Sequence, residues 1–117
     1  MNHDFDSAAL WNRIGHDREL LGELVSVFAS EGPLMLAQIE MAVAHCEPEL
    51  LQKASHKLKG SLLQFSASRA AQLAQQLEMM GKTGNIEGAP AVLTTLRGEL
   101  QSVLISLRNM EAQPGRF

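Results

Sequence analysis

The stretch PELLQKASHKLKGSLLQF (residues 48–65) decides the fold class of this chain. Pro48 suits the first turn of a helix, because a backbone amide at that position has no partner within the helix. With about 100° between successive residues, the apolar side chains fall within an arc of about 80° and form one stripe that a helix can bury. These side chains are Leu51, Ala54, Leu58, Leu62 and Phe65. The stretch therefore predicts an amphipathic helix that packs against other helices.

The opposite side of this helix carries a solvent-facing histidine in a basic setting. His56 lies about 160° from the centre of the apolar stripe, and Gly60 follows on the same outward line one turn later. Such a face is available to a ligand or to a partner protein. Three lysines and a leucine surround the outward line, namely Lys53, Lys57, Lys59 and Leu63.

Gly60 is the residue on this face that most needs an explanation. A glycine within a helix costs about 1 kcal/mol relative to alanine, yet the apolar stripe continues past it to Phe65. Contact with another helix is one explanation, but Gly60 points away from the core stripe. The missing side chain instead leaves room beside His56 for a phosphoryl group or for a loop of a partner, and Lys57 and Lys59 can neutralise phosphate charge.

The next helix supplies a group that can orient the histidine ring. If residues 66–68 (Ser-Ala-Ser) form the turn, His56 lies eleven residues before Ala67 and Glu78 lies eleven residues after it. Two such positions lie at the same height in an antiparallel helix pair. Glu78 could then accept a hydrogen bond from His56 Nδ1 and leave Nε2 free as the nucleophile. The alternative is that Glu78 is a solvated surface charge.

Capping and turn residues before this stretch predict three further helices. A short helix begins after the N-cap Asp6, with Phe5 and Leu10 as a hydrophobic staple, and ends near residue 15. A second helix follows the N-cap Asp17 and is expected to break at residues 31–33 (Glu-Gly-Pro). A third begins at Pro33, and its apolar stripe consists of Leu36, Ile39, Val43 and Cys46.

Two helices are predicted after the turn at residues 66–68, which brings the total to about six. One begins at Ser68 and carries Leu73, Leu77 and Met80 as its apolar residues. A loop marked by three glycines, Gly81, Gly84 and Gly88, ends it. The last helix follows Pro90, and its apolar stripe consists of Leu93, Leu96, Leu100, Val103, Leu107 and Met110.

Long amphipathic helices with short connections predict the fold class. We expect an all-α protein, an antiparallel up-down four-helix bundle with one or two short accessory N-terminal helices. The 117 residues suffice for one domain and are too few for two ordinary ones. Residues 1–117 are therefore expected to form a single domain.

Composition and charge argue against several other classes of protein. The net charge is −3 without a basic block, so we expect no nucleic-acid binding. No apolar run is long enough to span a membrane and no signal-peptide pattern begins the chain, so we expect a cytoplasmic protein without membrane insertion. The single cysteine, Cys46, forbids an internal disulfide. His3, His16 and His45 have no ligand at metal spacing, so we expect ordinary surface roles and no metal site.

The run ASHKLKGS (residues 54–61) resembles the signature of histidine phosphotransfer (HPt) domains, in which a histidine is followed by x-x-Lys-Gly-Ser. The resemblance covers nearly the whole chain and includes Asp17 near the start and Leu77-Glu78 in the second half. It implies an antiparallel four-helix bundle, in agreement with the helix pattern. It also implies that the chain carries a phosphoryl group between its histidine and aspartates of response-regulator receiver domains in two-component phosphorelays.

The resemblance also implies roles for individual residues. His56 matches the phosphoacceptor, and Lys59 matches its basic neighbour. Gly60 matches the glycine of close approach, and Glu78 matches the carboxylate or amide that orients the ring. Ser66-Ala67 departs from the Gly-Ala that is frequent in the family, a change that bears on turn geometry more than on transfer.

The resemblance further implies how the chain finds its partners. A receiver domain, or a hybrid sensor histidine kinase, would dock on the face around His56 and supply Mg²⁺ and the acidic pocket. We expect Lys53, Lys57 and Lys59 at the charged rim of this face and Leu63 as its apolar anchor. The alternative for Leu63 is packing against a neighbouring helix. Lys57 stands where a small or apolar residue is common in the family.

Two other functions remain as alternatives to a phosphocarrier. A non-phosphorylated helical adaptor could dock the same signalling partners, but an outward His56 beside a costly Gly60 argues against it. A bundle enzyme or metalloprotein would need carboxylates and histidines that point inward, and the predicted core stripes contain none. No nucleotide-binding motif is recognisable, so we expect a monomeric carrier without a cofactor of its own and without autophosphorylation from ATP.

Overall fold

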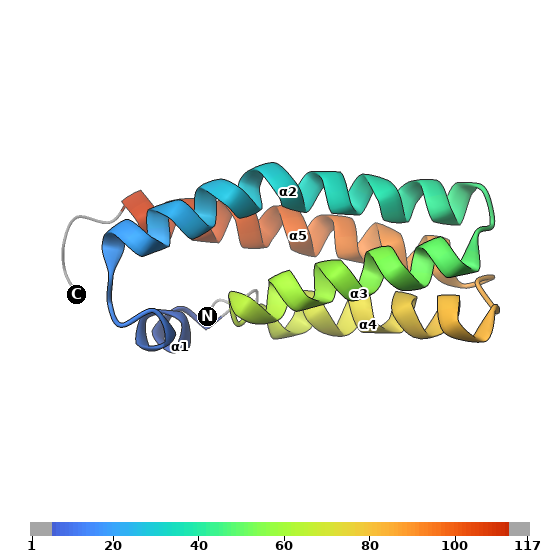
Figure 1. Ribbon diagram of the computed structural model, residues 1–117, viewed down its shortest axis with the longest axis horizontal. Helices are drawn as coiled ribbons and strands as arrows, with labels where there is room; N and C mark the ends of the chain where they lie inside the picture. Colours follow the sequence, from blue (N-terminus) through green and yellow to red (C-terminus); the bar gives the residue numbers. More distant parts are fainter. Residues whose placement is uncertain (1–5, 113–117) are drawn as a thin grey trace.

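The computed structural model describes residues 6–112, in which five helices form an elongated bundle (Figure 1). Helices α2 and α5 lie along one long side of the bundle, and α3 and α4 lie along the other. Each of these four helices packs against two neighbours, because α3 also contacts α2 and α5 also contacts α4. The all-α bundle with one short N-terminal helix is therefore confirmed. The helices are α1 (Ser7–Arg13), α2 (Arg18–Ala44), α3 (Pro48–Gln64), α4 (Ser68–Thr83) and α5 (Ala89–Ala112).

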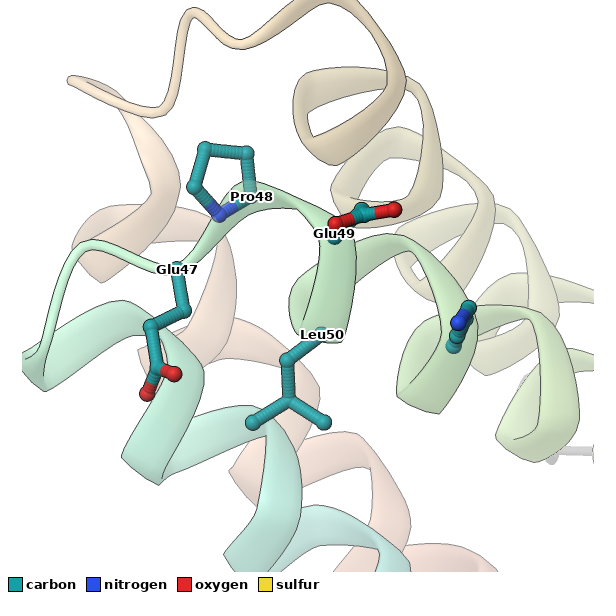
Figure 2. A pocket seen from close by; sticks show the side chains of 5 residues that line it. Glu47, Pro48, Glu49 and Leu50 are labelled. Carbon is teal, nitrogen blue, oxygen red and sulfur yellow. The ribbon is translucent and has the colours of Figure 1, made fainter.

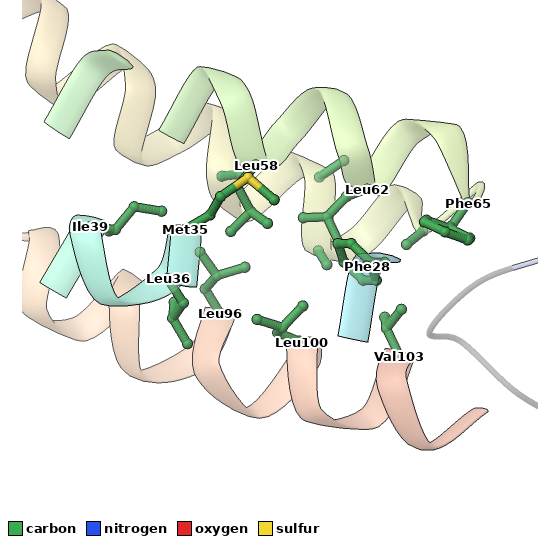
Figure 3. Close-up of a cluster of buried hydrophobic side chains, with 14 of the residues drawn as sticks. Phe28, Met35, Leu36, Ile39, Leu58, Leu62, Phe65, Leu96, Leu100 and Val103 are labelled. Carbon is green, nitrogen blue, oxygen red and sulfur yellow. The ribbon is translucent and has the colours of Figure 1, made fainter. Parts of the chain in front are cut away.

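One hydrophobic core runs through the centre of the bundle, where the apolar stripes of the four long helices meet (Figure 3). The predicted stripes of α3 and α5 are buried throughout. In the close-up, side chains of α2 and α3 point toward those of α5 and fill the space between the helices. The labelled members of this core are Phe28, Met35, Leu36, Ile39, Leu58, Leu62, Phe65, Leu96, Leu100 and Val103.

Helix α2 is continuous over 27 residues, so the predicted break at residues 31–33 is wrong, as is the count of six helices. Pro33 lies inside this helix, where a proline removes one hydrogen bond and costs about 3 kcal/mol. The buried positions nevertheless continue across it at helical spacing, from Phe28 through Gly32 to Met35 and Ile39. Burial of this stripe in the core therefore outweighs the local preference for a break.

The fusion of two predicted helices also gives α2 the length and composition of a membrane span. An 18-residue window of α2 has a mean hydropathy of 1.4, and it is the one such window within residues 6–112. The expectation that no apolar stretch of this length exists was therefore wrong. In the structure Leu21, Val25, Phe28 and Ile39 of this helix are buried against the rest of the bundle. One face of α2 thus belongs to the core of the bundle, while 33% of the apolar window as a whole is buried.

Helices α3 and α4 approach closely because the facing side of α4 is built from small residues. Its buried positions are Ala70, Ala71, Ala74, Leu77 and Gly81, whereas Leu73 and Met80 are only half-buried. A Cβ atom on Gly81 would lie 2.5 Å from the backbone oxygen of Pro48 and 2.5 Å from the backbone nitrogen of Gln52. Gly81 is therefore a packing residue inside α4, and its predicted place in a loop was wrong. Gly84, with a φ of 83°, ends the helix instead.

Side-chain caps begin the first two helices, as predicted. The Asp6 side chain accepts a hydrogen bond of 3.0 Å from the backbone nitrogen of Ala9, and Asp17 accepts one of 3.0 Å from that of Leu20. Each cap satisfies a backbone donor that has no partner within its helix. The other half of the predicted staple, Phe5, lies outside the described residues, as does His3.

Three turns place a residue other than glycine in the left-handed region of φ. They are His16 after α1, Cys46 after α2 and Ser66 after α3, with φ values of 59°, 52° and 58°. Cys46 is thus an exposed turn residue, so its predicted place on a helical stripe was wrong. Ser66 thus holds a conformation that glycine adopts without steric cost.

Candidate functional site

His56 lies on the outer face of α3 at the middle of the bundle, with 68% of its side chain exposed. Its Nδ1 atom is 2.8 Å from Oε2 of Glu78 on α4. The short turn between the two helices brings these residues to the same height, as the symmetric spacing about Ala67 predicts. Glu78 is therefore a partner of the histidine ring, and the alternative of a solvated surface charge is wrong.

The second oxygen of the same carboxylate is held by a lysine. Lys59 Nζ is 2.7 Å from Glu78 Oε1, and both side chains are largely shielded from solvent. The Lys59 ammonium beside it holds the pKa of the Glu78 carboxyl below its ordinary value; the His56 ring acts in the same direction, and partial burial opposes both. Glu78 is therefore ionised at neutral pH.

The ionised carboxylate determines which ring nitrogen of His56 is free. A carboxylate without a proton can only accept hydrogen bonds, so the Nδ1 atom that faces Glu78 must carry the proton. In the neutral ring Nε2 then holds the lone pair. An exposed imidazole with a fixed tautomer is a nucleophile that a partner protein can reach without a cleft in this chain.

Gly60 stands in open space on the same face. A Cβ atom at this position would have no heavy atom within 4 Å outside its own helix turn and chain neighbours. Contact with another helix therefore does not explain this glycine. The outward direction predicted for Gly60 is correct, and the open space beside His56 is available to an approaching group.

The other predicted residues of the face differ in exposure. Lys53 and Lys57 are exposed, whereas Lys59 turns inward to Glu78. Leu63 has 48% of its surface exposed, so it is not packed into the bundle core. It lines, together with Lys59, a shallow hollow of about 230 Å³ between α3 and α4.

An apolar groove between α2 and α3 adjoins this face and was not predicted from the sequence. Its volume is about 250 Å³. On α3 the groove is lined by Ser61 and Gln64, which lie within about one helical turn of Gly60. Val27 stands at its edge with 60% of its surface exposed. Its lining residues are Leu24, Val27, Phe28, Glu31, Met35, Ser61, Gln64 and Phe65.

A larger and more open hollow, of about 580 Å³, lies at the start of α3 (Figure 2). Glu47 and Leu50 point to one side of the turn, and Pro48 points to the other. Lys53, which also lines this hollow, stands one turn before His56 on α3. The mixture of two glutamates, a proline and one lysine gives this hollow no group aimed at a common point, and we assign it no role.

Two features near the site, a cap on α3 and a buried serine, have no recognisable signal in the sequence. The Arg13 guanidinium of α1 donates hydrogen bonds to the backbone oxygens of Leu63 and Gln64, the latter at 3.0 Å. It thereby caps the C-terminal end of α3 from a distant part of the chain. Ser55, next to His56, is fully buried, and its hydroxyl has no hydrogen-bond partner within residues 6–112.

Comparison with known proteins agrees with this geometry. The model of the Hpt domain family matches residues 23–106, which is most of the chain. The fold is also similar to the crystal structure of histidine-containing phosphotransfer protein B (HptB) from Pseudomonas aeruginosa. The TM-score is 0.86 and the sequence identity 19%, over 92% of this chain and 94% of that chain. A comparison with curated proteins gave no match.

The chain belongs to the Hpt domain family. Its biochemical class is that of a phosphocarrier in two-component phosphorelays, which passes a phosphoryl group on and is not a kinase. The predicted family and fold are thereby confirmed.

Proposed function

We propose that His56 is the phosphoacceptor and that its Nε2 atom exchanges a phosphoryl group with aspartates of receiver domains. In the forward step the Nε2 lone pair forms a bond to phosphorus as the bond between phosphorus and the aspartate oxygen breaks. The products are the phosphorylated histidine and a free carboxylate on the receiver. Transfer onward is the same step in reverse.

The observation that carries this proposal is the contact of 2.8 Å between His56 Nδ1 and Glu78 Oε2. It directs the lone pair to Nε2, on the exposed side of the ring. The open space over Gly60 allows another protein to approach this atom. His16 and His45, the other described histidines, also lie at the surface, but neither is paired with a shielded carboxylate.

The partner supplies the remaining chemistry under this proposal. The receiver provides Mg²⁺, which neutralises charge on the transferring phosphoryl group, whereas this chain provides the nucleophile and needs no cofactor or ATP site of its own. A hybrid sensor histidine kinase that carries a receiver domain is a second candidate partner. We place this exchange in the cytoplasm and expect the chain to act as a monomer.

The apolar groove between α2 and α3 is the surface that we propose for docking. It adjoins the outward line of His56 and Gly60. Val27 of α2 lines it and is exposed, and Leu34, two turns later on the same helix, is exposed as well. Contacts of signalling proteins combine an apolar centre with a charged rim. The rim here consists of Lys53, Lys57 and Glu31, all exposed. Leu63 lies on the other side of His56, toward α4, and serves as an edge of this surface more than as its centre.

A direct test compares two exposed histidines. The parent protein, His56→Gln and His45→Gln are incubated with a panel of receivers carrying a radiolabelled aspartyl phosphate, and acid-labile label on the chain is measured. We expect the parent and His45→Gln to be labelled and His56→Gln to remain unlabelled while keeping its helical circular dichroism.

Two outcomes would contradict the proposal. Label on His56→Gln at the level of the parent would place the phosphoryl group on another residue. A parent that binds receivers but accepts label from none of them would favour the alternative function, a helical adaptor that docks the same partners without phosphorylation.

A further inference from the structure

The short helix α1 is joined to the C-terminal end of α3 at both of its own ends (Figure 1). At the start of α1, the backbone nitrogen of the N-cap Asp6 donates a hydrogen bond of 3.3 Å to the backbone oxygen of Ser66. At its last residue, one guanidinium nitrogen of Arg13 donates to the backbone oxygens of Leu63 and Gln64. Helix α1 is therefore held against the end of α3 by contacts to the backbone.

The contact from Arg13 supplies what the end of α3 lacks. The last carbonyl groups of a helix have no amide partner within it, and their partial negative charge favours a cation nearby. The last turn of α3 contains no basic residue of its own. Arg13 provides both the donor and the positive charge from a position 50 residues earlier in the chain.

Helix α1 is a fixed support for this arginine. Leu10 is fully buried and Trp11 is 4% exposed, so burial of these two apolar side chains holds α1 in the bundle without the help of Arg13. The Trp11 ring also stacks on the imidazole of His16, with 6.0 Å between the ring centroids. Loss of the Arg13 side chain should therefore loosen the end of α3 and leave α1 in place.

The end of α3 that Arg13 caps lines both depressions beside Gly60. Gln64 and Phe65 line the groove between α2 and α3, and Leu63 lines the shallow hollow between α3 and α4. The two carbonyl groups that accept from Arg13 belong to Leu63 and Gln64, one residue from each depression. Fraying of this turn would therefore move side chains on both sides of the proposed docking surface.

We propose that Arg13 is a positioning residue for the partner: its cap keeps the last turn of α3, and with it the groove, in the conformation that a receiver domain binds. This inference rests on the proposed docking of a receiver at the groove. It goes beyond that docking because it gives a task to a residue of α1 that does not line the groove. His56 lies about two turns before this end of α3, so the chemical step of transfer should not depend on Arg13.

The cap affects binding through the fraction of molecules in which the last turn of α3 is formed. The apparent dissociation constant equals the intrinsic constant divided by that fraction. If loss of the Arg13 side chain lowers the fraction to about one fifth, the receiver concentration for half-saturation rises about fivefold. The rate at saturating receiver stays the same, because bound receiver selects the formed turn.

The test compares Arg13→Gln with the parent in two measurements. The first is amide hydrogen exchange at Phe65 and Ser66, whose backbone nitrogens donate to the oxygens of Leu62 and Leu63 and thus report whether the last turn is formed. The second is the rate of transfer from the phosphorylated receiver that labels the parent best, over a range of receiver concentrations.

We expect Arg13→Gln to change both measurements in a defined way. Exchange at the two amides should approach that of unprotected amides, and the half-saturation concentration should rise about fivefold. The rate at saturating receiver should change by less than about twofold. Arg13→Lys keeps a charge and donors for the same carbonyl groups, so it should bring exchange and half-saturation back toward the parent.

Arg18→Gln is the matched control. Arg18 of α2 donates a hydrogen bond of 3.2 Å to the backbone oxygen of Glu111, in the last turn of α5. It thus caps the end of another helix with the same chemical group, and it does not line the groove. Half-saturation and saturating rate of this variant should match those of the parent.

Three results would overturn the inference. Faster exchange with an unchanged half-saturation concentration would show that docking does not depend on the last turn of α3. A raised half-saturation concentration with unchanged exchange would show that Arg13 contacts the receiver itself. An equal rise in Arg18→Gln would show that any loss of stability weakens docking.

Failure of the proposed function would be recognised separately. If the parent binds receivers but accepts label from none of them, the proposed role of His56 fails. The affinity for the receiver, measured by titration calorimetry for the parent and the same three variants, then replaces the half-saturation concentration and decides the role of Arg13 in the same way.

Discussion

Helices α3 and α4 each contain one internal glycine, and the two glycines have opposite surroundings. A Cβ atom on Gly60 of α3 would meet open space, whereas one on Gly81 of α4 would lie 2.5 Å from backbone atoms of α3. Both residues weaken their own helix by about 1 kcal/mol relative to alanine. Close packing against α3 compensates for this cost at Gly81, whereas no contact within residues 6–112 compensates for it at Gly60. The difference separates a glycine that the fold requires from one that only a partner can explain.

The largest effect that we expect comes from closing the tight contact. Gly81→Ala places a methyl group against the backbone of α3, which does not yield as a side chain would. Overpacking of this kind costs about 1–3 kcal/mol, more than the roughly 1 kcal/mol gained in helix preference. Urea denaturation should therefore show a lower free energy of unfolding. A variant as stable as the parent would show that α3 and α4 can move apart and accommodate the methyl group without a loss of stability.

The open glycine should respond in the opposite way. Gly60→Ala should raise the free energy of unfolding by up to about 1 kcal/mol, because alanine favours the helix and meets no neighbour. Gly60→Gln should keep the fold but slow phosphoryl transfer at least tenfold, since a long side chain then stands beside His56. Urea denaturation and receiver-dependent labelling measure the two effects. Unimpaired transfer by Gly60→Gln would show that a partner does not need this space.

A smaller effect should show whether the receiver docks on the groove between α2 and α3. Val27→Asp puts a charge at the edge of the groove between α2 and α3, where we expect the receiver to dock. Loss of an anchor residue of an interface costs more than about 1 kcal/mol, so we expect a rise of about tenfold in the receiver concentration for half-maximal transfer.

Ile105→Asp is the matched control for this change, because Ile105 of α5 is similarly exposed, at 54% against 60% for Val27, and does not line the groove. Transfer by this variant should equal that of the parent. Equal effects of the two substitutions would show that the groove has no special part in docking.

Features set by one helix or by one short turn were predictable from the sequence. The stripe of α3 is buried as its spacing predicts. The pairing of His56 with Glu78 followed from their equal distances to Ala67, because three residues between two helices leave little freedom in their relative height. The positive φ of Ser66 is likewise a feature of one short turn.

Features set by distant parts of the chain were not predictable in this way. Pro33 has the local character of a helix break, and only burial of the residues on both sides of it keeps α2 continuous. Local spacing likewise favoured Leu73 and Met80 for the core side of α4, yet small residues such as Ala74 and Gly81 face α3 there. A regular series of small residues was the available signal for this close contact.

The groove and the cap of α3 depend on contacts between distant residues, which no local sequence pattern predicts. The groove combines side chains from α2 and α3, and Arg13 reaches carbonyl groups fifty residues farther along the chain. The pairing of Lys59 with Glu78 lay within reach of the sequence, since Lys59 is three residues after His56. The pairing was not predicted because Lys59 was assigned to phosphate alone.

The close α3–α4 hairpin has a consequence for the order of folding. His56 and Glu78 are separated by 22 residues, whereas the ion pair between Glu40 of α2 and Arg97 of α5 spans 57. A shorter loop loses less chain entropy when it closes, so contacts local in sequence form earlier. We expect α3 and α4 to associate first and to provide the surface on which α2 and α5 then assemble. The nucleophile and the carboxylate that orients it would thus come together before the rest of the domain is folded.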